Sequence, residues 1–143
     1  MQKTLRTKIA SIEREMDGHT AAVAKGRQEV EKLEAALTQA RMTLRDEREA
    51  LANISKETLH FASFGAAFFA GQEERIDVLL HAMRTQEARI ENHLEEIRGL
   101  FGEKEKYRLL LEQMREKAKH AATLKEEIES DERIRQRERR KVE

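Results

Sequence analysis

The sequence predicts an all-α protein, a long antiparallel two-helix coiled-coil hairpin. Three observations lead to this prediction: apolar residues recur at alternating steps of three and four, the 143 residues include no proline, and 39% of them are charged. Periodic apolar positions without the strongest helix breaker indicate long helices. A chain with five phenylalanines, one tyrosine and no tryptophan has too little apolar volume for a compact layered core.

The first helix is expected over about residues 3–61, where one apolar or small residue recurs in a seven-residue pattern. The positions of this seam are Leu5, Ile9, Ile12, Met16, His19, Val23, Gly26, Val30, Leu33, Leu37, Ala40, Leu44, Glu47, Leu51, Ile54, Thr58 and Phe61. His19, Gly26 and Glu47 suit a buried seam poorly. A strict heptad keeps its apolar stripe on one side only when the helix supercoils with a partner, so this helix requires one.

The chain is expected to reverse direction at about residues 62–71, within the uncharged sequence FASFGAAFFAG. Gly65 and Gly71 bracket this segment, and glycine supplies the left-handed conformation that commonly ends helices. The acidic residues that follow Gly71 favour the N-terminal end of a new helix. The alternative is one unbroken helix through this segment, which would dimerise along its whole length.

The second helix is expected over about residues 72–138 and carries a looser seam. Its positions are Ile76, Leu79, Met83, Gln86, Ile90, His93, Ile97, Leu100, Lys104, Tyr107, Leu111, Met114, Ala118, Ala121, Lys125 and Ile128, with Leu94, Phe101 and Leu110 widening the apolar face. Arms of similar length would bring both termini to one end, with Ile12 near Ile128. All 143 residues are expected to form a single coiled-coil domain.

Two groups of residues are candidate partner-binding surfaces. Phe64, Phe68 and Phe69 lie in the uncharged segment and, if exposed, would form an apolar patch of the kind that marks a binding surface. The alternative is that these rings fold inward and fill the tip of the hairpin.

The second candidate is the C-terminal segment, where the charge changes sign. Residues 126–132 contain five acidic residues and no basic ones, and they are followed by Arg133, Arg135, Arg137, Arg139 and Arg140. Such a segment could reach into an acidic protein pocket, a nucleic acid or an anionic membrane. The alternative is a solvated helix end whose cations offset the helix dipole. Nucleic acid is the weaker functional choice, because this segment contains no aromatic side chain that could stack on bases.

Enzyme signals are poor, so we expect no catalytic residue, no cofactor and no bound metal. The Glu57–His60 spacing matches a di-iron element, but that site requires a second copy of the element and further acidic helices. The longest apolar run, residues 61–70, is half the length that a membrane-spanning helix needs. The chain also has no cysteine, which agrees with a reducing compartment. We expect a soluble cytoplasmic protein without membrane insertion.

The C-terminal sequence from Glu126 to Arg135, with its Asp131-Glu132 pair followed by arginines, resembles the closing pattern of the FliJ and YscO family of flagellar and type III secretion stalk proteins. The resemblance extends to the length and two-helix layout of the chain. It implies a non-enzymatic coiled-coil stalk that stands in the ring of the export ATPase hexamer, contacts the export gate and escorts chaperones.

The matching arm lengths favour a monomeric hairpin, with a homodimer as the alternative. By the resemblance its partners are proteins, and residues from Leu5 to Met16 and from Ile128 to Arg140 would enter the hexamer. Peripheral association with the membrane through the export gate is left open. The alternative function is a structural or scaffold coiled coil that homodimerises and has no role in secretion.

Overall fold

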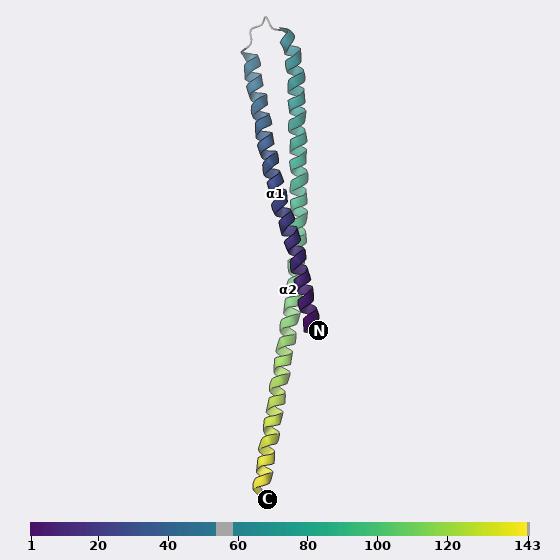
Figure 1. Cartoon of the computed structure of the whole chain (residues 1–143), viewed down its shortest axis with the longest axis vertical. Helices are drawn as coiled ribbons and strands as arrows, with labels where there is room; N and C mark the ends of the chain where they lie inside the picture. The colour runs from purple at the N-terminus through teal and green to yellow at the C-terminus, as the bar shows by residue number, and fades with distance from the viewer. Residues whose placement is uncertain (54–58, 143) are drawn as a thin grey trace. The chain divides into compact units, whose positions relative to one another are not determined.

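The computed structural model describes residues 1–53 and 59–142, and the side chains of residues 59–64 lie outside the description. Two helices account for nearly all of these residues (Figure 1): α1 is Gln2–Ala52 and α2 is Leu59–Val142. Leu51, near the end of α1, contacts Gly65 near the start of α2, whereas His19 lies against His93 much further along. The helices therefore run antiparallel, and the predicted all-α two-helix hairpin is confirmed.

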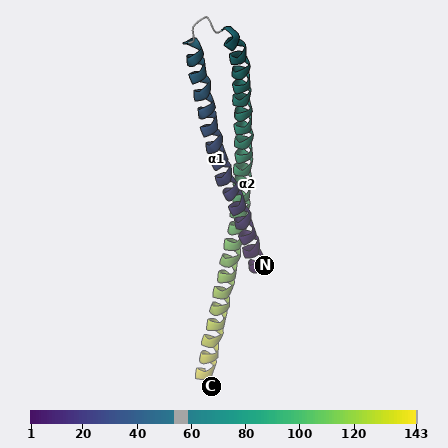
Figure 2. The same cartoon turned by 45° about the horizontal axis from the view of Figure 1, so that its top comes forward.

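The contacts between the helices group the chain into two compact units. One unit is residues 17–98, and the other consists of Met1–Met16 with Gly99–Glu143. In each unit a segment of α1 lies against a segment of α2 that runs in the opposite direction (Figures 1 and 2). The single coiled-coil domain over residues 1–143 stays a prediction.

In the 17–98 unit, the side of α1 that faces α2 is the predicted seam. Val23, Leu37, Ala40 and Leu44 are at most 8% exposed, and Gly26 is also buried. Glu47 is the seam position that lies exposed, which agrees with the high cost of burying an unpaired carboxylate. Ile54 and Thr58, and the side chain of Phe61, lie outside the described residues.

The predicted α2 positions from Ile76 to Ile97 are all half-buried in the same unit. In the second unit Ile12 and Leu111 are buried, and Leu5, Ile9 and Met114 are half-buried. Burying the apolar stripe of each helix against the other is the main stabilising contribution to such a pair. Of the residues predicted to widen the face, Leu94 is half-buried, while Phe101 and Leu110 are about half exposed at 53% and 47%.

The predicted position of the reversal is wrong. Residues 62–71 are helical and belong to α2, and α1 ends at Ala52, about nine residues earlier than expected. No described glycine has a positive φ angle, so Gly65 and Gly71 do not end a helix. An ideal Cβ on Gly65 would lie 2.7 Å from Leu51 Cδ1. Gly65 therefore allows close approach of the two helices instead of providing a turn.

The predicted similarity of the two arms is also wrong. The α1 helix has 51 residues and α2 has 84. In the second unit Glu13 pairs with Lys104 and Lys8 lies over Tyr107, so the N-terminal part of α1 covers α2 only as far as about Met114. Ile128, predicted to lie near Ile12, is 59% exposed. The reason is the earlier reversal, which shifts the whole pairing register of α2 toward its N-terminal end.

Candidate functional site

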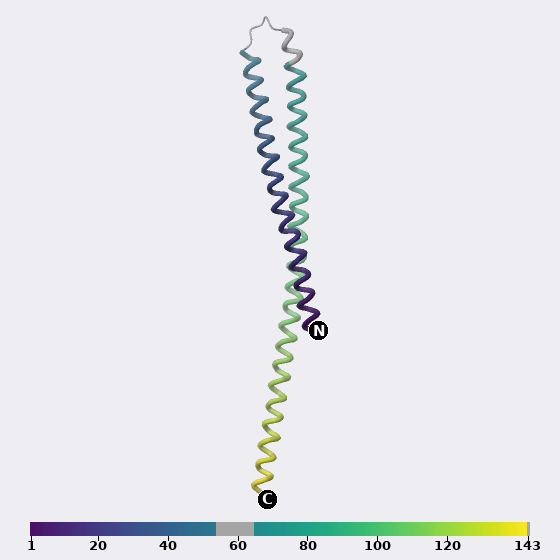
Figure 3. Tube along the Cα trace, viewed as in Figure 1, coloured from purple at the N-terminus to yellow at the C-terminus, as the bar shows by residue number. Residues whose placement is uncertain are grey.

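The candidate functional site is the C-terminal part of α2, residues 115–142, which we call the α2 tail. Every residue of the tail is helical and exposed. Figure 3 shows the yellow end of the trace continuing past the N-terminal end of α1, with no α1 segment beside it. At 1.5 Å per residue the tail is about 40 Å of single helix. The lack of proline and the abundance of Glu, Lys and Arg favour a helix here even without a packing partner.

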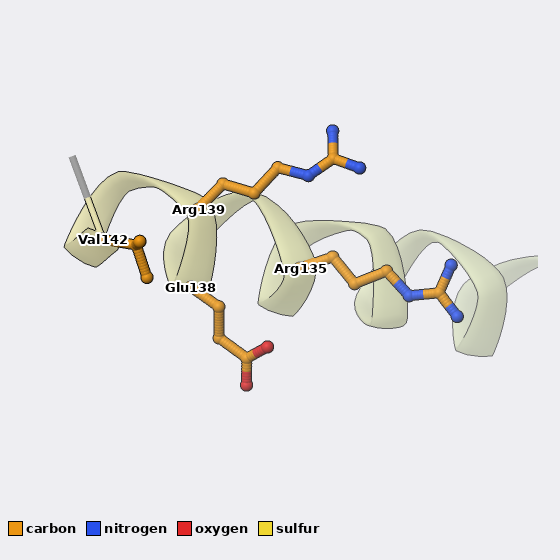
Figure 4. Close-up of a pocket in the computed structure, with 4 residues that line it drawn as sticks. All are labelled: Arg135, Glu138, Arg139 and Val142. Atoms are coloured by element: carbon orange, nitrogen blue, oxygen red, sulfur yellow. The ribbon is translucent and has the colours of Figure 1, made fainter.

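The five candidate arginines Arg133, Arg135, Arg137, Arg139 and Arg140 all lie in the tail and are exposed. Arg135 and Arg139 share an open surface area with Glu138 and Val142. Figure 4 shows both guanidinium groups displaced along the helix toward its N-terminal side, that is, toward the acidic residues 126–132. Long side chains on helices commonly point this way.

The charges of the tail form no ion pair with any described residue. Over residues 109–142, which the structure describes completely, no ion pair lies within 4.0 Å. Elsewhere such pairs do form, for example Arg48 with Glu73 at 2.6 Å and Lys104 with Glu13 at 3.2 Å. The tail is therefore a helical surface with strong charge and uncompensated side chains, which suits recognition of a charged protein surface.

The structure treats the three candidate phenylalanines differently. Phe68 is 40% exposed and meets Phe69 edge to face, with ring centroids 6.0 Å apart. Phe69 is half-buried, and the Arg48 guanidinium carbon lies 5.7 Å from its ring centroid. The side chain of Phe64 lies outside the described residues, as does Glu57 of the Glu57–His60 pair. The described rings therefore divide between the surface and the contact with α1.

The seam also contains a polar contact that the sequence analysis did not anticipate. His19 and His93, both noted as seam positions, place their Nδ1 atoms 2.8 Å apart, with ring centroids at 5.1 Å. Close by, a groove is lined by Gly26, Ile90 and His93 together with charged residues. The contact could have been predicted from a register that places His19 opposite His93. That register follows from where the chain reverses, and the reversal was predicted at the wrong residues.

In the described part of the chain no three His, Cys, Asp or Glu side chains gather in a way that could hold a metal ion. No helical stretch among the described residues has the length and apolar character needed to cross a membrane. Comparison with protein-family models, curated proteins and solved structures found no significant match to the chain. The functional argument therefore depends on the geometry and charge of the helices.

Proposed function

We propose that the protein is a non-enzymatic stalk of a bacterial flagellar or type III protein export apparatus, located in the cytoplasm. In this role the α2 tail contacts the ring of the export ATPase, and the protein also contacts the export gate and chaperones. The observation that carries the proposal is that α2 continues as one helix to Val142, although every side chain of residues 115–142 is exposed. The resemblance of the 126–135 sequence to the FliJ and YscO family supports it.

The helical geometry refines which residues would enter the ring. Residues Leu5 to Met16 pair with α2 between about Leu100 and Met114. The tail alone therefore supplies the free end, instead of both termini together. A single helix is narrower than a helix pair, with a diameter of about 10–12 Å including side chains. The sides of this helix differ, since Leu124, Ile128 and Val142 lie on one of them, and a difference around the helix is what unequal coupling to the subunits of a ring requires.

The test is stimulation of a purified flagellar or type III export ATPase by the full chain and by Arg133→Glu, Arg135→Glu and Arg137→Glu combined. The matched control reverses three exposed arginines of α1, Arg14→Glu, Arg27→Glu and Arg41→Glu, and so changes the net charge equally. We expect the tail variant to lose stimulation and the control to keep it, with equal helicity by circular dichroism. Equal stimulation by the tail variant and the wild type would contradict the proposal.

The alternative scaffold function, with dimerisation along both seams, is less well supported. Both seams are used within the chain, since Val23, Leu37, Leu44 and Leu111 are already buried by the hairpin. A second copy would have to replace those contacts with equivalent ones. Small-angle X-ray scattering separates the two arrangements, because a dimer of two extended chains is much longer than a hairpin.

A further inference from the structure

The charges of the α2 tail are arranged symmetrically about Arg133. Acidic residues on its N-terminal side and arginines on its C-terminal side lie at equal distances from it along the chain. The matching positions are Glu126 with Arg140, Glu127 with Arg139, Glu129 with Arg137, and Asp131 with Arg135. Reversing the direction of this helix therefore exchanges the signs of charge at these four pairs of positions, which is the property of a surface complementary to itself.

One side of the tail also carries its own seven-residue pattern. Leu124, Ile128, Asp131, Arg135, Glu138 and Val142 follow one another at steps of four, three, four, three and four. These steps place them on one side of the helix. The apolar members Leu124, Ile128 and Val142 are 45%, 59% and 88% exposed. The same side leads back through Ala121 and the exposed Lys117 to Met114, the last residue covered by α1, so this stripe adjoins the established interface.

We propose that the α2 tail is a self-association surface, on which the tail of a second copy lies antiparallel with Arg133 of both copies at the centre. In this register Leu124 of each copy lies opposite Val142 of the other, and Asp131 lies opposite Arg135. The overlap is residues 124–142, about 27 Å of helix. It ends before the second copy reaches the N-terminal end of α1, which covers α2 only to about Met114.

Electrostatics select this arrangement over a parallel pair. A parallel pair in register places residues 126–132 of both copies side by side, and like charges in contact oppose association. The antiparallel pair sets Asp131 against Arg135 on the shared side and Glu127 against Arg139 beside it, while the charges of the far side stay in solvent. Within one helix Asp131 and Arg135 are spaced to pair with each other, yet no ion pair forms in this region of the structure. Lys125 opposite Lys141 and Ile128 opposite Glu138 weaken the interface, so the dimer is an exchangeable one.

This inference does not depend on the proposed role in export. A tail held by a second copy is not free to meet another protein, so self-association and partner binding by the tail exclude each other. The export proposal is tested by ATPase stimulation and this one by molecular mass, so the failure of one is distinguishable from the failure of the other.

The first experiment is sedimentation equilibrium of the full chain and three charge variants at low ionic strength. The all-basic tail carries Glu126→Lys, Glu127→Lys, Glu129→Lys and Asp131→Lys. The all-acidic tail carries Arg135→Glu, Arg137→Glu, Arg139→Glu and Arg140→Glu, and the exchanged tail carries all eight substitutions. We expect wild type and exchanged tail to reach twice the 16.7 kDa monomer mass. The all-basic and all-acidic tails should each associate at least about tenfold more weakly. Like charges then face each other across the interface, and low ionic strength leaves their repulsion unscreened.

Mixing the all-basic and all-acidic tails provides the control for folding. Each acidic segment then meets a basic one, so the mixture should recover a dimer containing one chain of each kind. A wild type that stays monomeric, single-sign tails that associate like the wild type, or a mixture and an exchanged tail that fail to associate would each overturn the proposal.

Direction is tested by disulfide formation, because the chain contains no cysteine. In the antiparallel pair Leu124→Cys should cross-link with Val142→Cys when the two variants are mixed. Neither should cross-link with itself, since the two copies of residue 124 are about 27 Å apart. Cross-linking of Leu124→Cys alone would show a parallel pair and contradict the proposal.

Discussion

His19 Nδ1 lies 2.8 Å from His93 Nδ1, across the interface between α1 and α2. For this hydrogen bond one imidazole donates its N–H and the other accepts with an unprotonated nitrogen. Both residues are half-buried and occupy seam positions whose neighbours are mostly apolar. The pair thus joins the helices through a polar contact inside a mostly apolar seam.

Replacing both histidines of this pair should cost less stability than the two single replacements added together. A single imidazole left in the half-buried contact loses its hydrogen-bond partner, whereas two leucines restore an apolar contact between the helices. We expect His19→Leu and His93→Leu alone each to lower the free energy of unfolding by about 1 kcal/mol, and the double variant to lower it by less than the sum. Urea unfolding measures all three variants, and strictly additive losses would contradict this interpretation of the pair.

Gly26 should resist substitution because α2 approaches it closely. An ideal Cβ at this position would lie 2.8 Å from Ile90 Cγ1 and 3.3 Å from Ile90 Cδ1. We expect Gly26→Ala to destabilise the protein by about 1–3 kcal/mol through overpacking, despite the better helix propensity of alanine. Gly18→Ala is the control, since nothing lies within 4 Å of its added Cβ, and it should stabilise by about 0.5–1 kcal/mol. Urea unfolding measures both.

Gly71 tests where the chain reverses. It lies inside α2, it has no positive φ angle, and no atom lies within 4 Å of an added Cβ. We expect Gly71→Ala to raise the free energy of unfolding by about 0.5–1 kcal/mol, because alanine favours a helix interior. A clear destabilisation in urea unfolding would instead place a turn at this residue, as the sequence analysis predicted.

The α2 tail should be the helical segment whose amide hydrogens are least protected from exchange with solvent. It buries no side chain, and helices without packing partners are marginal in water. We expect hydrogen exchange, followed by mass spectrometry on the wild type at low protein concentration, to be at least about 100-fold faster over residues 118–142 than around Leu37 and Leu44. Under conditions of self-association the tail should become protected. Tail protection as high as that of the 37–44 segment at every dilution would contradict this prediction.

Much of the helix pairing was predictable from the heptad pattern. Ile12, Val23, Leu37, Leu44 and Leu111 were all predicted seam positions and are all buried. An apolar residue that recurs every three or four positions lies on one side of a helix whatever the partner is. The candidate arginines lie on the surface, because leaving water costs a charged group more free energy than burial returns.

The register was not predictable from that pattern, because a heptad repeat looks the same after a shift of seven residues. The choice depended on the turn, and the glycines indicated the wrong segment. Gly65 makes room for Leu51, and that need is invisible until the opposing helix is known. Asn53, Ser55 and Thr58, residue types that favour helix ends, were the weaker signal nearer the end of α1.

The sequence by itself determined that the protein is helical, which side of each helix is apolar, and where the charge changes sign, because these properties belong to one helix at a time. The tertiary structure alone decided which residues of α2 meet α1. Pairing is a property of two helices, and the position of the reversal settles it. That register leaves residues 115–142 uncovered, and the α2 tail is an exposed helical surface for this reason.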